Sequence, residues 1–233
     1  MKIAISQPTF LPWHGYFGLI DYVDEFVFLE NIQFDKRSWQ QRNRLRNRKE
    51  SYYISLPVST KGKRDQKICN VKIIYEKNLV SKILTNIRLN YKNSPYYENY
   101  YHDLSNIFLK KNEKLSLLNK ELIFFFCNIM NIKTKFSSDL ELNINSRKID
   151  YLRDISLKKN ATTYITTMGS KDYLENLVFF PNTSIAIKYF KFNDLKYKQI
   201  NDNFISKLSI LDLIFNLGPN SLNYIRKCFK IIS

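Results

Sequence analysis

Hydrophobic residues in the first thirty positions follow two different periods. Residues 2–6 and 25–29 are short apolar runs of the kind that form buried strands. The segment between them has apolar residues at helical spacing: Trp13, Phe17, Ile20 and Val23. Pro12 stands near the start of this predicted helix, where its missing N–H is tolerated. A strand, a helix and a second strand in this order predict parallel strands and an α/β sheet.

The rest of the chain alternates between the same two patterns. From Lys77 to Met130, apolar residues recur every three or four positions in three successive segments, which predicts helices. Further strand-like runs are found at 51–58, 70–75, 162–167 and 184–190. Further helical patterns are found at 146–160, 171–177 and 206–218. We therefore predict one α/β domain over residues 1–233. Its mostly parallel sheet is built from β-α-β units, with a helical subdomain at about 77–132 inserted mid-chain.

Positive charge is concentrated in one part of the sequence. The formal net charge is +16, and residues 31–67 hold eleven Lys or Arg against three acids, which is +8. Such an excess attracts nucleic acid, an acidic membrane surface, phosphorylated substrates or an acidic carrier protein. A charge run is also an ordinary solvated face. Here Gln33, Trp39, Gln41 and Asn43 are interleaved with the cations, which favours a binding site.

Cysteine usage and hydropathy narrow the class of protein. Cys69, Cys127 and Cys228 are far apart and form no CxxC pair, so neither a zinc site nor a disulfide framework is indicated. No other metal-binding motif is present. The longest apolar run, 122–127, is too short to span a bilayer, and the N-terminus does not resemble a signal peptide. These features predict a cytoplasmic protein without a transmembrane segment.

The loop after the first strand is the first candidate site. In open α/β sheets, ligands bind beyond the carboxyl ends of the strands, and a following helix N-terminus can face an anion. We therefore expect Gln7, Trp13 and Tyr16 to contribute to a ligand pocket. His14 is a candidate general base or phosphate contact, although a histidine at a helix start also serves structural roles.

The basic run supplies the second group of candidates. Arg42 and Arg44 can each bind phosphate or carboxylate through two parallel hydrogen bonds, and Lys36 adds a point charge. Trp39 offers a flat face on which a base or a sugar can stack. These residues form the strongest candidate site in the chain, and Gln33 and Asn43 are expected to bind substrate with them.

Two later segments add weaker candidates. Ser138 follows a predicted strand, and the absence of a GxSxG elbow makes it a candidate for binding rather than a nucleophile. Gly169 stands where a strand leads into a helix and could expose backbone N–H groups to an anion. Tyr173 follows it in the same segment. A plain turn explains Gly169 equally well.

Several motifs together resemble one protein family. The run Q-P-x-x-L-P-W-x-G-Y-F-x-x-I begins at Gln7, D-x-F-V begins at Asp24, and Q-F-x-K-x-x-W-x-x-R-N begins at Gln33. These motifs, and segments as far as residue 218, are similar to the WbqC-like proteins of bacterial polysaccharide gene clusters. This chain departs from the family pattern at Gln41 and at 166–167, and His14 occupies a variable position of the first motif.

The resemblance implies a function in O-antigen or capsule synthesis. It implies an enzyme that transfers an acyl or aminoacyl group onto the amino group of a nucleotide-linked amino sugar. The donor would be a thioester of coenzyme A or of carrier-protein phosphopantetheine, with no cofactor bound permanently and no metal. An acidic acyl or peptidyl carrier protein would then be a partner. Lys36, Arg42 and Asn43 would stabilise charge, and His14 or Asp35 would accept the proton.

Two other classes of function stay open at this point. One is a non-catalytic protein that binds anions or nucleic acid through the basic run. No recognisable nucleic-acid module is present, so nucleic acid is not the expected partner. The other is an ATP-dependent enzyme like the nucleotidyltransferases, because W-H-G-Y invites comparison with their HxGH motif. Tyr16 replaces the second histidine of that motif, which argues against this chemistry.

Overall fold

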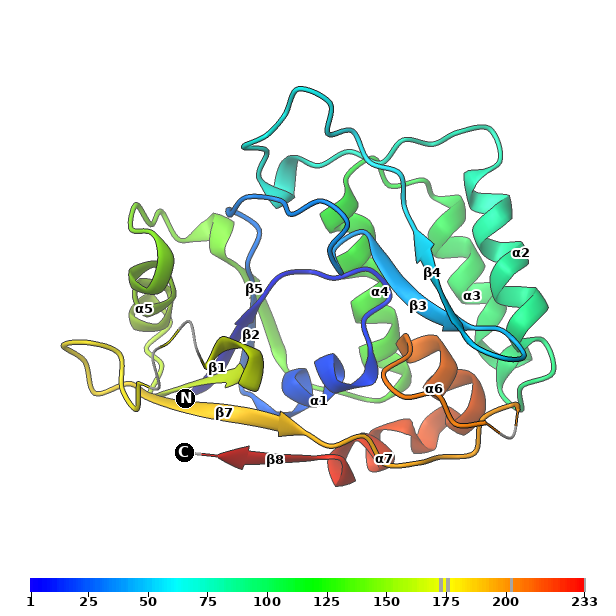
Figure 1. Ribbon diagram of the computed structural model, residues 1–233. Coiled ribbons are helices and arrows are strands. Elements are labelled where there is room, and N and C mark those ends of the chain that lie inside the picture. The colour runs from blue at the N-terminus through cyan, green and yellow to red at the C-terminus, as the bar shows by residue number, and fades with distance from the viewer. Residues whose placement is uncertain (172–173, 175–176, 202, 233) are drawn as a thin grey trace.

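The central feature of the computed structural model is a six-stranded sheet of order β5-β2-β1-β6-β7-β8 (Figure 1). The structure describes residues 1–171, 174, 177–201 and 203–232. The strands are β1 (Lys2–Ser6), β2 (Glu25–Phe28), β5 (Lys135–Ser138), β6 (Thr163–Thr167), β7 (Ala186–Phe192) and β8 (Phe229–Ile232). The pairs β5–β2, β2–β1, β1–β6 and β6–β7 are parallel, and β8 runs antiparallel to β7. The predicted α/β class with a mostly parallel sheet is confirmed.

The order of the strands fixes where a ligand can enter. From β1 the chain moves outward to β2 and later to β5, and it then returns to the other side of β1 to add β6 and β7. The winding direction therefore reverses between β1 and β6. Connections leaving these two strands diverge, which opens a crevice beyond their carboxyl ends, the usual ligand position in such sheets.

Helices cover both faces of the sheet. They are α1 (His14–Tyr22), α2 (Leu79–Tyr91), α3 (Tyr97–Leu109), α4 (Leu115–Ile129), α5 (Lys148–Lys158), α6 (Ile210–Leu217) and α7 (Ser221–Lys227). Short 3-10 turns are η1 (Ile68–Asn70), η2 (Asp139–Glu141), η3 (Met168–Ser170) and η4 (Gly218–Asn220). Figure 1 shows α5 on one side of the sheet and α2, α3, α4 and α6 on the other. The predicted helices of the middle segment and at 146–160 and 206–218 are thus present.

Alternation along the central strands explains this two-sided arrangement. Ala4 and Phe26 belong to the larger hydrophobic core, with residues of α1, α4 and α6. Ile3 and Val27 belong to a smaller core with Tyr151 and other residues of α5. Successive side chains of a strand point to opposite faces, so each central strand contributes to both cores.

A separate two-stranded sheet stands beside the carboxyl edge of the central one. Its strands, β3 (Arg42–Arg46) and β4 (Ser51–Ser55), pair antiparallel. Leu45 and Ile54 face the large core, while Tyr53 and Ser55 face outward. The predicted strand at 51–58 is observed as β4, and its partner is Arg42–Arg46.

Some predicted elements differ from those observed. The segment 70–75 alternates buried Val71 and Ile73 with exposed residues, as a strand would, but it is no regular strand. Its backbone groups pair one by one with other loops, as in the bond from the Ile73 amide to the Glu113 carbonyl. The predicted helix at 171–177 includes residues outside the described ranges. The elements α7 and β8 are not predicted by the sequence pattern. Across the described ranges, every helix is too short or too polar to cross a bilayer.

Candidate functional site

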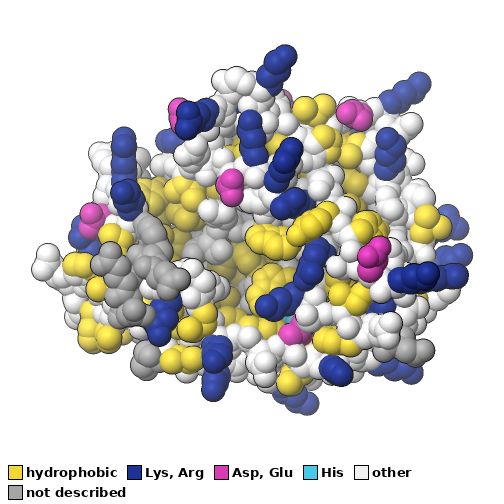
Figure 2. Space-filling model, viewed as in Figure 1, with side chains coloured by type: hydrophobic (Ala, Val, Ile, Leu, Met, Phe, Trp, Pro, Cys, Tyr) yellow, Lys and Arg dark blue, Asp and Glu magenta, His cyan; other side chains and the backbone are white. Residues whose placement is uncertain are grey.

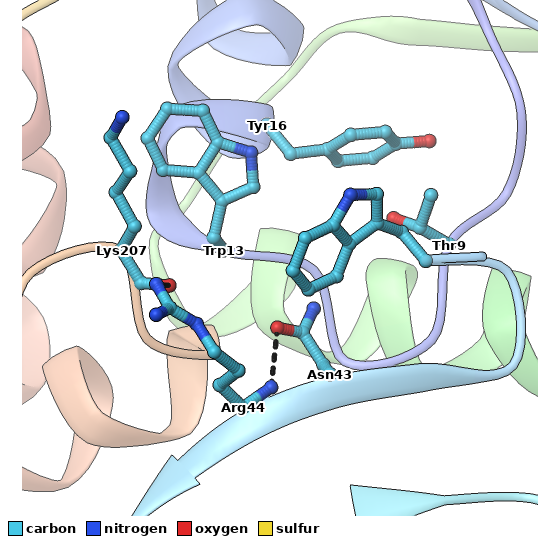
Figure 3. A pocket seen from close by; sticks show the side chains of 7 residues that line it. Thr9, Trp13, Tyr16, Asn43, Arg44 and Lys207 are labelled. Atoms are coloured by element: carbon cyan, nitrogen blue, oxygen red, sulfur yellow. Dashed lines mark hydrogen bonds between the residues drawn. The ribbon is translucent and has the colours of Figure 1, made fainter. Parts of the chain in front are cut away.

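A pocket of about 270 Å³ opens beyond the carboxyl end of β1. It is lined by Thr9, Trp13, Tyr16, Trp39, Asn43, Arg44 and Lys207. In Figure 3, Trp13 and Tyr16 lie along one side of the pocket, and Asn43 and Arg44 lie along the other, on β3. Three segments far apart in the sequence therefore meet here: residues 9–16 after β1, residues 39–44 at the start of β3, and the segment between β7 and α6. We call this last segment, residues 193–201 and 203–209, the strap.

The loop after β1 is held in place by buried amides. The Asn43 side chain donates to the carbonyl oxygens of Phe10 and Leu11, at 3.1 and 2.8 Å. Leu11 has φ of 44°, a backbone region that costs energy for a non-glycine residue, so these bonds fix an unfavourable turn. Asn43 is 2% exposed, and its amide nitrogen is used by the loop. Its role in this structure is to shape the pocket wall.

Gln7 lies one layer behind the lining. Its side-chain oxygen accepts from Gln40 Nε2 at 2.6 Å, and its carbonyl accepts from the Tyr16 hydroxyl at 2.9 Å. Burial raises the pKa of Tyr16 well above its ordinary value, so this hydroxyl keeps its proton at neutral pH. Tyr16 thus presents its ring to the pocket and directs its polar end into the fold.

Trp13 is placed by a close contact inside its own motif. A Cβ on Gly15 would lie 2.2 Å from the Trp13 ring, so only glycine allows the indole to fold back over α1. The indole also packs against the rings of Phe192 and His14, at 4.9 and 5.5 Å between ring centroids. The W-x-G part of the first motif therefore encodes a local ring position.

His14 lies beneath the pocket and is enclosed by aromatic rings. It is 1% exposed, and its Nε2 donates to Asp194 Oδ1 at 2.8 Å. Asp194 also accepts from the Tyr224 hydroxyl and from the Lys207 backbone amide, each at 2.8 Å. Burial alone would raise the pKa of Asp194, but the bonds from His14, Lys207 and Tyr224 outweigh it and hold this pKa below its ordinary value. The His14–Asp194 pair thereby anchors the strap that carries Lys207.

The pocket is positively charged. Arg44 donates through Nη2 to the carbonyl oxygens of Ser206 and Lys207, at 3.2 and 3.0 Å, and fixes the strap from the other side. The Lys207 ammonium makes no ion pair with any residue that the structure describes. The seven lining residues include no carboxylate. Figure 2 shows hydrophobic side chains in a recess of this face, with Lys and Arg along its upper and right margins. The site therefore suits an anionic ligand with a flat or apolar part.

Comparison with known proteins places the chain in a family. The sequence model of the WbqC-like protein family matches residues 7–224. The chain belongs to the WbqC-like family. A relative from Mycobacterium tuberculosis, Rv1507c, described as an uncharacterized protein, is 31% identical over 229 residues, which cover 97% of this chain and 98% of the relative. No solved structure matches the chain.

Several of the predicted site residues lie outside the pocket lining. Asp35 and Lys36 are exposed on the loop that precedes β3. Gln33 donates to the Arg64 carbonyl at 2.9 Å and ties this loop to the basic loop 60–67. Arg42 stands on the outer face of β3, with its guanidinium carbon 4.4 Å from the centre of the Tyr53 ring. Gly169 is exposed in η3, beyond β6, and Tyr173 lies outside the described residues.

Ser138 belongs to a second polar group, which we call the Glu30 cluster. Its members are Glu30, Lys120, Ser138, Asp139 and Tyr151. Glu30 Oε2 accepts from Lys120 Nζ and Ser138 Oγ, each at 2.9 Å. Asp139 accepts from the Glu30 and Asn31 amides and from the Tyr151 hydroxyl. Among the described residues, no group of three His, Cys, Asp or Glu side chains is placed to hold a metal ion.

Arg44 was predicted with Arg42 as an anion contact and lines the pocket, whereas Thr9 and Lys207 were not predicted. Thr9 stands at an unspecified position of the first motif, Q-P-x-x-L-P. No pattern in the sequence around Lys207 indicates that it lines a site. It reaches the pocket because of tertiary bonds and a backbone φ of 53°.

Proposed function

We propose that this WbqC-like protein is an enzyme of surface-polysaccharide synthesis, acting in the assembly of O-antigen or capsule. In this proposal it transfers an acyl or aminoacyl group from a thioester to the amino group of a nucleotide-linked amino sugar. The supporting observation is the pocket itself. Two indole rings and the Lys207 ammonium, which has no ion pair among the described residues, meet beyond β1, at the point where the winding of the sheet reverses.

The chemical character of the pocket fits such an acceptor. A hexose presents apolar C–H faces that pack on aromatic rings, and Trp13 and Tyr16 supply these rings. A nucleotide-linked sugar also carries a diphosphate, which needs cations. Lys207 and Arg44 lie at the same pocket, and a lysine ammonium carries three donors that can bind phosphate oxygens.

The transfer step is an acyl substitution. The amine nitrogen of the sugar attacks the thioester carbonyl carbon, the new C–N bond forms and the C–S bond breaks. The nitrogen loses one proton, which the departing thiolate takes up, directly or through water or a protein base. The protein accelerates this step by holding the amine against the carbonyl and by stabilising the oxyanion.

The three predicted catalytic residues, His14, Asp35 and Lys36, have different roles in this proposal. His14 is enclosed, so we assign it a positioning role, through Asp194 and the Lys207 amide. Asp35 and Lys36 are exposed on the loop before β3, close in sequence to Trp39, and stay predictions as proton acceptor and charge stabiliser. The thioester donor, of coenzyme A or of an acidic carrier protein, would approach from the basic side of the pocket.

Intrinsic fluorescence offers a direct test, because the chain has two tryptophans and both line the pocket. Titration with nucleotide-linked amino sugars is expected to change the emission of the wild-type protein. Lys207→Met should weaken this binding about tenfold, since one charge-assisted contact is lost. Lys196→Met, which removes an exposed cation from the same strap, is the matched control and should bind normally. Neither change should alter thermal unfolding.

Transfer is then assayed by mass spectrometry. The mixture contains the nucleotide-linked amino sugar that binds and a series of acyl and aminoacyl thioesters, and the product is the sugar with one acyl group added. If the protein instead binds single-stranded DNA with an affinity that falls steeply with salt, and does not bind nucleotide sugars, the result would favour a nucleic-acid-binding protein.

A further inference from the structure

Two large aromatic rings are exposed beside each other at the pocket: Tyr53 on the outer face of β4, and Trp39 in the turn before β3. Trp39 and Tyr53 are each 50% exposed, and their ring centroids are 6.1 Å apart with a tilt of 41°. The guanidinium of Arg42 lies 4.4 Å from the Tyr53 ring. We call Trp39, Arg42 and Tyr53 the hairpin platform. Packing of the core does not explain these exposed side chains, because the hairpin packs on the core through its opposite face, which carries Leu45 and Ile54.

Strand geometry makes the platform continuous with the pocket. Tyr53 pairs with Arg44 across the hairpin, and Arg42 pairs with Ser55, so the outward side chains of both strands share one face. Arg44 and Trp39 also line the pocket. A ligand that fills the pocket and extends outward past Trp39 therefore meets Tyr53 and Arg42 next.

We propose that the hairpin platform is the nucleobase subsite of the nucleotide-linked substrate. The inference rests on the proposed function and adds an orientation to it. The sugar lies in the pocket between Trp13 and Tyr16, the diphosphate lies near Lys207 and Arg44, and the base stacks on Trp39 and Tyr53 outside the pocket.

The chemistry of the platform matches a base better than a sugar or an acyl chain. Bases stack on aromatic rings and on guanidinium planes. Arg42 is held by a ring rather than by a carboxylate, since it makes no ion pair among the residues described. Its charge is therefore not neutralised and can serve the α-phosphate. Stacking alone reads no base edge, so the platform is expected to bind the base without setting its identity.

A structural role for the three side chains is the alternative. Cross-strand aromatic and cationic pairs stabilise a hairpin by about 0.2–1 kcal/mol. Such a role would affect unfolding and would not distinguish a ligand with a base from one without. The experiment therefore compares ligand fragments by calorimetric titration: uridine diphosphate, inorganic diphosphate, and an amino sugar 1-phosphate.

The decisive variant is Tyr53→Ile, which keeps a residue suited to a strand and removes the ring. It should weaken uridine diphosphate and the nucleotide-linked sugar about tenfold and leave the two ligands without a base unchanged. Tyr53→Phe keeps the ring and should bind as the wild type does. Phe179→Leu removes a ring of matched exposure, 51%, from a segment that pairs with β7, and should have no effect.

The outcomes separate the two proposals. Equal affinity of the wild type and Tyr53→Ile for a nucleotide-linked sugar would overturn the platform and leave the proposed function standing. Binding of uridine diphosphate that depends on Tyr53, with no acyl transfer to any sugar, would support the platform and remove the proposed reaction. If neither nucleotides nor nucleotide sugars bind, both proposals fail.

Discussion

The pocket and the Glu30 cluster lie along the same edge of the sheet, and both are rich in polar side chains. In the Glu30 cluster each charged group has a partner: Glu30 meets Lys120 and Ser138, and Asp139 meets two backbone amides and Tyr151. In the pocket, Lys207 has no ion pair within the described ranges, and Trp39 leaves half of its surface exposed. The two regions therefore differ in whether their polar and charged groups already have partners within the protein.

This difference separates residues that hold the structure from residues that are available to a ligand. A buried polar group that already has its hydrogen bonds stabilises the fold, and a ligand would have to displace those bonds. Ser138 illustrates the first kind, because its hydroxyl is directed to Glu30 in a buried setting. Lys207 illustrates the second. Substitutions test this distinction: a change in the Glu30 cluster should lower the stability of the fold, and a change in the pocket should lower the affinity for a ligand.

Removal of the Asp139 carboxylate should have the largest effect on stability. Asp139→Ala leaves the Glu30 and Asn31 amides and the Tyr151 hydroxyl without their acceptor, in a site that is 2% exposed. We expect a loss of at least about 3 kcal/mol in the free energy of unfolding, measured in urea. Asp150→Ala, which removes an exposed carboxylate from α5, is the control and should change little. A similar small effect of Asp139→Ala would show that these donors find water instead.

The next largest effect is expected from the ion pair of the same cluster. Lys120→Met leaves the Glu30 carboxylate, 1% exposed, with Ser138 as its remaining side-chain donor. This change should cost about 3 kcal/mol, because an unpaired charge is left buried. The double variant Glu30→Gln with Lys120→Met should regain much of that loss. Lys110→Met, at an ion pair with an exposed lysine, is the matched control and should be nearly neutral. An additive double variant would mean that the two charges do not interact.

The sequence predicted the fold better than it predicted the site. Short apolar runs located β1 and β2, which contribute to both cores, and helical spacing of apolar residues located α1 and the helices α2 to α4. The segment 70–75 shows where the pattern misleads. Alternation reports which side chains are buried, and it does not report whether a neighbouring strand exists to receive the backbone bonds.

The site was predicted in part for a similar reason. Trp13, Tyr16, Trp39 and Asn43 could be found because they are concentrated in two motifs, and all four line the pocket. Lys207 comes from a strap more than 160 positions from Asn43, and it is placed by bonds from Asp194 and Arg44 that no local pattern encodes. Residue type also does not show whether a polar group is already bonded, as Asn43 and Ser138 demonstrate.

Asp194 combines both properties, because it is a buried, hydrogen-bonded group that also holds the strap of the pocket. Its substitution should have the smallest effect on the free energy of unfolding, and this effect should depend on pH. Its pKa is lower in the folded protein than the unfolded value of about 3.9, so its contribution is fully present above that value and is lost as the pH falls through the folded pKa. Asp194→Asn should therefore destabilise the protein by about 1 kcal/mol at pH 7 in urea titrations, and the gap should narrow toward pH 3. A gap that stays constant down to pH 3 would contradict this sign.

Because Asp194 also binds the Lys207 amide, the same substitution should weaken nucleotide-sugar binding. Lys207→Met should lower affinity alone and Asp139→Ala stability alone. Asp194→Asn should lower both, as expected for a buried carboxylate whose bonds position the ligand-binding strap.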